Sequence, residues 1–249
     1  MKPFLFVADI DNTLVGDDRA LKILSQKLAQ HRQQYGTKIV YATGRSLYSY
    51  EIIATEKSLL TPDALLASVG TEIYFDPKTK KPSFQWSKIL TEGWNRRKII
   101  EIASIFSTLQ IQPDSEQNPF KISYYLDRSV AKSTMIELDN ALKKAGFEVK
   151  FIYSSGQDFD ILPKNGDKGL AVKFLQDRWQ ILSKNTVTCG DSGNDIALFE
   201  SSEKGVIVGN AKPELLLWYK KHKRDSLYLA EAHYADGVLE GLQHFEFVK

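Results

Sequence analysis

Short segments of the chain are almost continuously apolar. They are FLFVADI at 4–10, KIVYAT at 38–43, ALLASV at 64–69, TVTCG at 186–190 and GVIVG at 205–209. Runs of this length are typical of strands that are covered on both faces, as in a parallel sheet. The pattern therefore predicts one buried sheet to which all of these segments contribute.

Between these runs, apolar residues recur at the spacing of one helix face. In the segment 17–30, Leu21, Leu24 and Leu28 share a side, and the two aspartates at its start can cap the first turn. Similar patterns predict helices at 46–58, 167–180, 193–202, 212–221 and 233–244. Strands that alternate with helices indicate a doubly wound α/β domain, whose ligands bind beyond the carboxyl ends of the strands.

A turn region rich in Pro and Lys, at 75–86, marks a change of pattern in the middle of the chain. The elements predicted beyond it are helices at 88–108 and 129–145 and alternating strands at 120–126, 147–155 and 157–163. Helices placed among alternating strands indicate a small α+β layer rather than more of the parallel sheet. We therefore predict an inserted domain at 83–164 and a core domain formed by 1–82 and 165–249.

Composition excludes several classes of protein. Lys plus Arg number 33 and Asp plus Glu 31, a net charge of +2, so we expect no binding to nucleic acid or to a membrane surface. The basic run at 220–224 is typical of a solvated helix end. The N-terminal segment does not resemble a signal peptide, no run of roughly 18 apolar residues occurs, and the single Cys189 cannot form an internal disulfide. We expect a cytoplasmic protein.

Two acidic residues follow the first predicted strand. Asp9 and Asp11 lie one residue apart, so a strand would place both carboxylates on the same face. Like charges at that distance repel each other unless a cation or a shared proton lies between them. The pair therefore indicates a metal site or a shared proton.

Other polar side chains follow neighbouring strands. Thr43, Gly44 and Arg45 come after the second run, GDSGND at 190–195 comes after the fourth, and Lys168 opens a nearby predicted helix. Because the carboxyl ends of parallel strands meet at one edge, these groups should form an oxygen-rich site. Mg²⁺ favours carboxylate, water and phosphate oxygens together. We expect Mg²⁺ and a phosphoryl group to share this site.

At this point the chain resembles a known superfamily. DIDNT at 9–13, Thr43 in ATGR, Lys168 and GDSGND at 190–195 are similar, in order, to the four motifs of the haloacid dehalogenase (HAD) superfamily of aspartate-based phosphatases. The predicted insert lies between the second and third motifs, where the larger caps of that superfamily occur. The resemblance spans essentially the whole chain and implies a Rossmann-like HAD core with an inserted α+β cap.

The resemblance also implies a role for each matched residue. Asp9 would be the nucleophile that forms an aspartyl phosphate, and Asp11 would protonate the leaving oxygen and then deprotonate water. The implied metal ligands are Asp9, the carbonyl of Asp11, Asp191 and, through water or Lys168, Asp195. The implied phosphoryl-binding groups are Thr43, Gly44, Asn194 and Lys168, and Arg45 is a further candidate for substrate binding.

Substrate choice is expected to depend on the insert. Its segments 116–127 and 154–163 combine amide, ammonium and carboxylate groups with aromatic rings, which suits a polyhydroxylated ligand. These segments resemble the sucrose-phosphate phosphatases of cyanobacteria and plants, which implies hydrolysis of sucrose 6-phosphate to sucrose and phosphate, the final step of sucrose biosynthesis. The candidate glucosyl contacts are Gln117, Asn118, Lys121 and Asp158.

Two positions leave other substrates open. Asn12 stands where many sugar phosphatases of the superfamily carry Gly, and Leu14 stands where sucrose phosphatases often carry Trp. The alternatives are a phosphatase for a glycosylglycerate or glycosylglycerol phosphate, a phosphomannomutase-like phosphotransferase, and a non-catalytic phosphosugar-binding partner of a synthase. Because every catalytic position is filled, we expect an enzyme rather than a binding protein. We also expect a monomer, with sucrose-phosphate synthase as its candidate protein partner.

Overall fold

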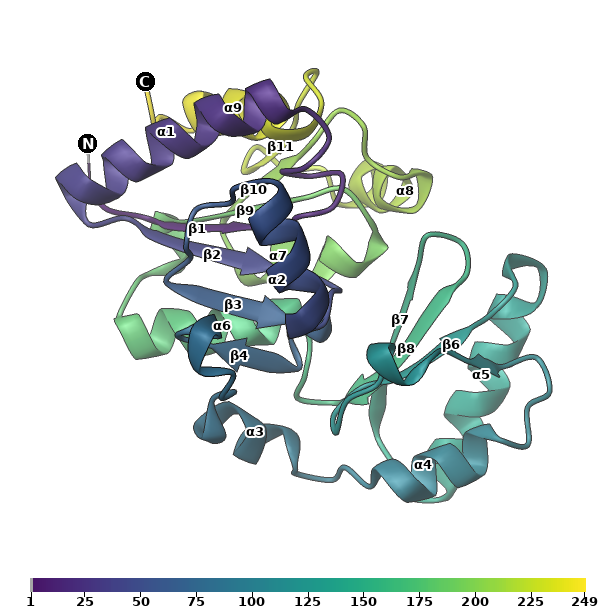
Figure 1. The fold of residues 1–249 in the computed structure, drawn as a ribbon. Coiled ribbons are helices and arrows are strands. Elements are labelled where there is room, and N and C mark those ends of the chain that lie inside the picture. The colour runs from purple at the N-terminus through teal and green to yellow at the C-terminus, as the bar shows by residue number, and fades with distance from the viewer. Residues whose placement is uncertain (1) are drawn as a thin grey trace.

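The computed structural model describes residues 2–249, and its centre is a large sheet with helices on both faces (Figure 1). The strands of this sheet are β1 (Leu5–Ala8), β2 (Lys38–Ala42), β3 (Ala64–Ala67), β4 (Glu72–Tyr74), β9 (Thr186–Gly190), β10 (Lys204–Ile207) and β11 (Leu227–Leu229). Among the described residues the order is β11-β10-β9-β1-β2-β3-β4, parallel except for the antiparallel pair β3 and β4. The predicted doubly wound α/β core is confirmed.

Separate apolar clusters fill the two faces of this sheet. The helices that cover it are α1 (Asp18–Tyr35), α2 (Leu47–Glu56) and α9 (Tyr234–His244) on one face, and α3 (Phe84–Leu90), α6 (Lys168–Trp179) and α7 (Ile196–Ser201) on the other. Because successive side chains of a strand point to opposite faces, Phe6 belongs to the first cluster while Leu5 and Val7 belong to the second. Burial on both faces explains why the strands are continuously apolar.

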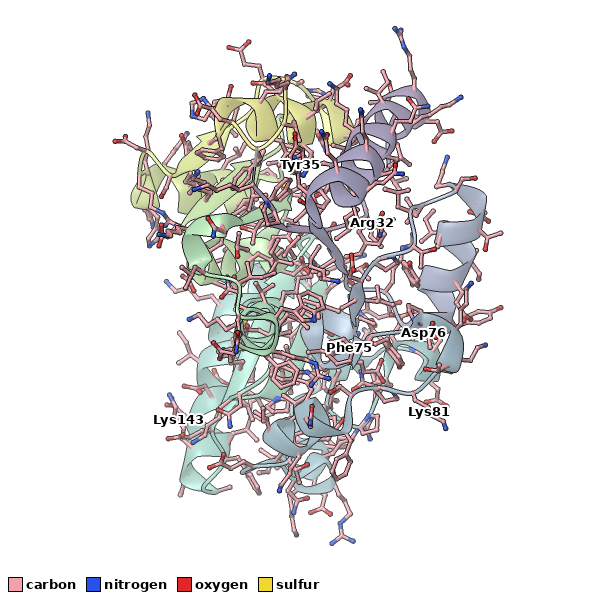
Figure 2. The ribbon with its side chains drawn as sticks, turned by 90° about the vertical axis from the view of Figure 1, so that its left-hand side faces the viewer. Arg32, Tyr35, Phe75, Asp76, Lys81 and Lys143 are labelled. Carbon is pink, nitrogen blue, oxygen red and sulfur yellow. The ribbon has the colours of Figure 1, made fainter. Side chains whose placement is uncertain are left out.

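A smaller antiparallel sheet forms a cap beside the core. Its strands are β5 (Gln110–Ile111), β6 (Ile122–Tyr125), β7 (Val149–Ser154) and β8 (Asp158–Pro163), in the order β5-β6-β8-β7. The helices α4 (Arg96–Ala103) and α5 (Arg128–Lys144) share one apolar cluster with this sheet. Figure 2 shows Tyr35 at the core end of the molecule and Lys143 at the cap end. The predicted α+β insert is confirmed.

The prediction of a single helix at 88–108 is wrong. Two helices, α3 and α4, occupy the region around it, and Asn95 caps the second one by accepting a hydrogen bond from the backbone N–H of Lys98 at 3.1 Å. Trp86 and Leu90 of α3 pack beneath the large sheet, whereas Ile99 of α4 packs in the cap. The first part of the predicted helix therefore buries its apolar side against the core, and the second part buries its apolar side in the cap.

Several short elements escaped the sequence pattern. The strands β4, β5 and β11 have two or three residues each, too few for a hydrophobic period to appear. The helix α8 (Pro213–His222) ends in a basic turn, as the run at 220–224 predicted. The domain boundaries at 83 and 164 stay predictions. Each helix described in residues 2–249 is too short or too polar to span a lipid bilayer.

Candidate active site

The predicted core residues meet at the carboxyl edge of the large sheet. Asp9 directly follows β1, Thr43 directly follows β2, and Asp191 directly follows β9. The site lies at the neighbouring ends of parallel strands, where doubly wound folds bind their ligands. Groups from distant parts of the chain are therefore brought together here.

Lys168 lies at the centre of this cluster and contacts three of its side chains. Its side chain is fully buried, and its ammonium donates hydrogen bonds to Asp9 Oδ1 at 2.8 Å, to Asn194 Oδ1 at 2.7 Å and to Asp195 Oδ1 at 2.7 Å. Burial by itself lowers the pKa of Lys168, but the carboxylates of Asp195 and Asp9 outweigh that effect and raise it. Lys168 is therefore held as a cation with all three of its N–H donors in use.

Asp195 is held from both of its oxygens. Oδ1 receives the bond from Lys168, and Oδ2 accepts the backbone N–H groups of Asp191 at 3.0 Å and Ser192 at 3.1 Å. A Cβ on Gly190 would lie 2.5 Å from the Cβ of Asp195, so only glycine fits at the end of β9. Because it accepts all of these hydrogen bonds, Asp195 orients both the 190–195 loop and the Lys168 side chain.

Asp9 and Asp191 each have a carboxylate oxygen that accepts no hydrogen bond within residues 2–249. Asp191 Oδ1 accepts the Thr13 hydroxyl at 3.3 Å, and Oδ2 is buried without a hydrogen-bond partner in residues 2–249. Burial, and then the charge of Asp195, raises the pKa of Asp191 to about 7. Burial also raises the pKa of Asp9, helped by Asp195 and Asp191 and opposed by Lys168. The positive charge near the two carboxylates therefore does not outweigh the cost of burying them.

This arrangement fits a divalent cation. Oxygen atoms of Asp9, Asp191 and Asp195 lie within 4.8 Å of one another. A buried carboxylate oxygen without a partner is costly, and a cation bound between Asp9 and Asp191 would satisfy it. The acidic cluster is able to bind a metal ion, as the sequence predicted.

The raised pKa of Asp191 predicts how stability depends on pH without metal. Its value is about 7 in the folded chain against an ordinary 3.8. The unfolded chain therefore loses this proton first as pH rises. The free energy of unfolding should fall between these values by up to about 1.4 kcal/mol per pH unit from this group. With a chelator present, the midpoint of thermal unfolding should decrease as the pH is raised from about 5 to 7, and this decrease should be larger in wild type than in Asp191→Asn.

Magnesium is the matching control for this prediction. A cation that binds only the folded state stabilises that state by mass action. At a pH above 7, where Asp191 is ionised, Mg²⁺ should therefore raise the midpoint of thermal unfolding of the wild type. It should raise the midpoint of Asp191→Asn much less. An identical pH dependence in both proteins would contradict the assignment of the raised pKa to Asp191.

Arg45, predicted as a substrate contact, holds Asp11 in a two-point ion pair. Its Nε donates to Oδ2 of Asp11 at 2.8 Å and its Nη2 donates to Oδ1 at 2.7 Å, while Nη1 is anchored on the Ser49 hydroxyl at 2.7 Å. The hydrogen bond to Asp11 raises the pKa of Arg45. The Asp11 side chain is 43% exposed and faces the cleft. Arg45 therefore orients the predicted acid and base.

A cleft of about 480 Å³ separates the sheet edge from the cap. From the core it is lined by the predicted residues Asp9, Asp11, Gly44, Arg45, Asp191 and Asn194. From the cap it is lined by Gln112, Glu116, Lys121, Ser154, Asp158 and Asp160. The side chains that could recognise a leaving group thus face those that could bind phosphate.

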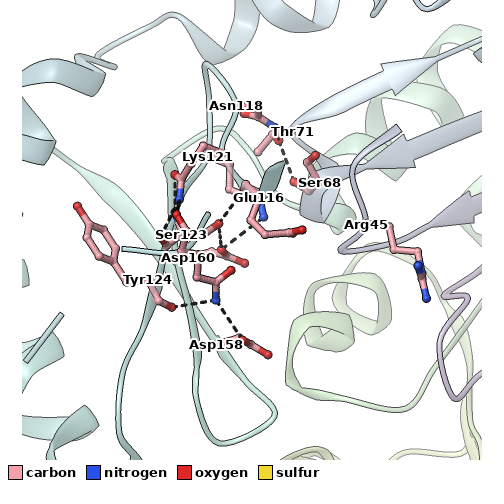
Figure 3. A network of polar contacts seen from close by, with 12 residues as sticks. Arg45, Ser68, Thr71, Glu116, Asn118, Lys121, Ser123, Tyr124, Asp158 and Asp160 are labelled. Carbon is pink, nitrogen blue, oxygen red and sulfur yellow. Dashed lines mark hydrogen bonds and ion pairs between the residues drawn. The ribbon is translucent and has the colours of Figure 1, made fainter. Parts of the chain in front are cut away.

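Two of the predicted cap residues line this cleft. Lys121 is buried and forms an ion pair with Asp160 at 3.6 Å, and Asp158 accepts a hydrogen bond from Gln112 Nε2 at 3.1 Å (Figure 3). Burial, then the charge of Asp160, raises the pKa of Asp158. Sequence reasoning missed Asp160, although its spacing of two from Asp158 places both on the same face of β8. It missed Gln112 because the strand beside it is too short to recognise.

The other two predicted cap residues do not line the cleft. Gln117 uses its amide on backbone groups, donating to the carbonyls of Gln112 at 3.1 Å and Ser123 at 2.9 Å and accepting the N–H of Ser123 at 3.0 Å. Asn118 donates to the Thr71 hydroxyl of the core at 2.9 Å. The structure therefore gives both amides partners within the protein.

Comparisons with known proteins agree with this geometry. The family described as sucrose-6F-phosphate phosphohydrolase matches residues 2–246. A probable sucrose-phosphatase 1 of Arabidopsis thaliana is 37% identical over 252 residues, 97% of this chain and 59% of that protein. This chain thus spans about three fifths of the length of its plant relative. A mannosylfructose-phosphate phosphatase of Agrobacterium fabrum is 32% identical and is covered, like this chain, over 98% of its length.

Solved structures share the fold. The sucrose-phosphatase of Synechocystis sp. PCC6803, determined in complex with sucrose and phosphate, has a TM-score of 0.91 and 41% identity, with 99% of each chain covered. A haloacid dehalogenase-like hydrolase of Bacillus subtilis has a TM-score of 0.69 and 17% identity, with 98% of this chain and 92% of that chain covered. The predicted HAD fold with a cap is confirmed.

Proposed function

Because the chain belongs to the sucrose-6F-phosphate phosphohydrolase family, we propose that it hydrolyses sucrose 6-phosphate to sucrose and phosphate. The observation that carries the proposal is the full-length match to a structure that binds sucrose and phosphate. The cleft supports it, because acidic and phosphate-binding groups on one wall face polar cap side chains on the other. The reaction proposed is a phosphoryl transfer to water in two steps.

In the first step, Asp9 attacks phosphorus. Lys168 holds Oδ1 of Asp9, and no hydrogen bond within residues 2–249 engages Oδ2, which leaves Oδ2 as the attacking oxygen. The bond between phosphorus and the fructosyl oxygen breaks as the aspartyl phosphate forms. For this step Asp11 leaves its ion pair with Arg45, carries a proton, and gives that proton to the leaving oxygen. Sucrose is then free to leave.

In the second step, water attacks the aspartyl phosphate. Asp11, now a carboxylate, takes a proton from that water, and the bond between Asp9 and phosphorus breaks. Phosphate leaves and both side chains return to their starting states. Because Asp11 gives a proton in one step and takes one in the next, it needs access to the cleft, which its exposure supports.

We assign the remaining core residues to charge and orientation. Mg²⁺ would be held by Asp9, Asp191 and the carbonyl of Asp11, and it would neutralise charge on the phosphoryl oxygens. Asp195 supports this site by orienting Lys168 and the backbone of the 190–195 loop. The phosphoryl-binding groups proposed are Thr43, Gly44, Asn194 and Lys168. The Thr43 hydroxyl accepts the N–H of Arg45 at 3.1 Å, which leaves its own hydrogen available to phosphate.

A second substrate is favoured by a specific observation. The mannosylfructose-phosphate phosphatase is 32% identical to this chain over 98% of the length of both. A phosphorylated disaccharide of mannose and fructose is therefore the first alternative, ahead of a glycosylglycerate or glycosylglycerol phosphate. A non-catalytic binding role has less support, because the proposed nucleophile, acid and lysine are all present.

A panel of phosphate esters tests the substrate. We expect sucrose 6-phosphate to give the highest kcat/KM with Mg²⁺, about tenfold or more above mannosylfructose phosphate and further above fructose 6-phosphate. A chelator should abolish release of phosphate. A preference for mannosylfructose phosphate would replace the proposed substrate, and hydrolysis of none of the esters would support the binding role.

We also propose a cytoplasmic location, which the buried free thiol of Cys189 supports because such thiols persist in reducing compartments. The monomeric state and the association with sucrose-phosphate synthase stay predictions from the sequence. Gel filtration of the protein, alone and mixed with the synthase, would measure both.

A further inference from the structure

The turn that follows β3 has an unusual backbone. Ser68, Val69 and Gly70 have φ angles of 51°, 60° and 84°. Glycine adopts such angles freely, but a β-branched residue such as valine pays a steric cost there. All three residues are buried. A strained conformation of this kind persists only where the surrounding structure enforces it.

The turn is fixed to two parts of the proposed phosphate site. The N–H of Ser68 donates to the carbonyl of Arg45 at 2.8 Å, and the N–H of Val69 donates to the carbonyl of Thr43 at 2.9 Å. On its other side, a Cβ on Gly70 would lie 2.6 Å from the backbone N of Lys168, so glycine allows this close contact. The turn therefore lies between the Thr43 loop and the start of α6.

The next residue joins this turn to the cap. The Thr71 hydroxyl donates to the carbonyl of Ser68 at 2.8 Å and accepts from Nδ2 of Asn118 at 2.9 Å (Figure 3). Thr71 is 1% exposed, so little water competes for this bond. Another hydrogen bond between cap and core, from the N–H of Ser155 to Glu214 at 3.3 Å, is exposed. The Thr71 bond should therefore constrain the cap more strongly than the Ser155 bond. A partly buried ion pair between Lys150 of β7 and Asp167, the N-cap of α6, also links cap and core.

Asn118 is itself fixed within the cap. Its Oδ1 accepts the N–H of Phe120 at 2.8 Å, and its carbonyl accepts Arg96 Nε at 3.1 Å. Its backbone also pairs with that of Lys121, whose side chain lines the cleft. A shift of Asn118 would thus carry Lys121 with it.

We propose that Thr71 and Asn118 form the joint that sets the cap over the phosphate site. They are positioning residues: Thr71 is anchored on the core by the turn that packs against Thr43 and Lys168, and Asn118 acts through Lys121 in the cap. Asn118 then acts by holding the cap and does not contact the sugar. This inference rests on the proposed function for its kinetic test. Its physical basis is that displacing a positioned group by about 1 Å can cost about 100-fold in rate.

A double-mutant cycle tests the joint. Asn118→Ala and Thr71→Val should each lower kcat/KM for sucrose 6-phosphate by roughly tenfold, mostly through KM, and the double variant should be no worse than the poorer single variant. Hydrolysis of p-nitrophenyl phosphate, which is too small to need the cap, should fall much less. Thr71→Ser keeps the hydroxyl and should restore activity. Glu214→Ala, which removes the exposed bond, is the matched control.

The opposite assignment gives a different pattern. If Asn118 contacts the sugar, Asn118→Ala lowers kcat/KM while Thr71→Val does not, and any effects of the two changes multiply. Additive effects, or equal losses with sucrose 6-phosphate and p-nitrophenyl phosphate, would overturn the joint.

A distance measurement tests the joint independently of the substrate. Fluorophores on Gln33→Cys at the end of α1 and Lys144→Cys at the end of α5 would report the position of the cap, because both sites are exposed and Cys189 is fully buried. Asn118→Ala should broaden the distribution of distances, and the Glu214→Ala control should not. If wild type hydrolyses no sucrose 6-phosphate but the broadening occurs, the proposed function fails and the joint stands. An unchanged distribution would overturn the joint.

Discussion

Asp9→Asn is expected to lower kcat for sucrose 6-phosphate by roughly four orders of magnitude or more, because an amide cannot form the phosphoryl ester. The fold should survive, since the amide oxygen can still accept the hydrogen bond from Lys168 that Oδ1 accepts at 2.8 Å. Burial raises the pKa of Asp9, so the change also removes a charge that folding disfavours. Steady-state release of phosphate and the midpoint of thermal unfolding measure the two effects.

Chemical trapping sharpens this test. Wild type that is quenched in acid during turnover of a labelled substrate should retain phosphate on the protein, and Asp9→Asn should retain none. Asp18→Asn is the matched control, because Asp18 is an exposed aspartate on the first helix of the core. A rate near that of wild type in Asp9→Asn would show that another group is the nucleophile.

Lys168→Met should damage stability as well as activity. The side chain is 0% exposed and donates to Asp9, Asn194 and Asp195, so its loss leaves Asp195, also 0% exposed, as a buried carboxylate without its cation. Breaking a buried ion pair from one side costs about 3–5 kcal/mol of unfolding free energy. The rate should fall at least about 100-fold, because Asp9 loses the bond that orients it. Urea unfolding and steady-state kinetics measure these losses.

Lys168→Arg is the informative control for this change. It keeps the positive charge, but a planar guanidinium cannot reproduce bonds to three separate acceptors in a space shaped for an ammonium. We expect part of the stability to return and most of the activity to stay lost. Wild-type stability in Lys168→Met would contradict the view that Lys168 neutralises the acidic cluster.

The two changes separate chemistry from architecture. At Asp9 the replacement is similar in size and keeps an acceptor, so we expect only the reaction to be lost. At Lys168 the same cluster loses its cation, so we expect the fold to weaken too. The difference arises because Asp195 has no access to water that could replace the lost charge.

The sequence was most informative where one physical rule governs a residue. Strands buried on both faces must be apolar throughout, so the runs that became β1, β2, β3, β9 and β10 were predicted from composition and length. The polar residues that follow those strands had to lie at one edge, because parallel strands end together. Asp9, Thr43 and Asp191 were predicted in this way.

The sequence was least informative where packing chooses between partners. The stretch at 88–108 was predicted as one helix because its apolar spacing does not reveal that Leu90 faces the core and Ile99 the cap. Likewise, an amide in a loop can bind a sugar or the backbone with equal ease. Gln117 and Asn118 were predicted as sugar contacts, and only the fold shows the partners that engage them.

By itself, the sequence determined the class of fold, the order of its elements and the set of acidic groups at the sheet edge, because these depend on local periodicity and on the direction of the strands. The tertiary structure alone decided which oxygens are satisfied and which are not. It showed that Asp195 is fully engaged, that Asp191 keeps an unpartnered oxygen within residues 2–249, and that Arg45 holds Asp11. Hydrogen bonding and burial depend on distances between groups far apart in the chain, and no pattern along the chain records those distances.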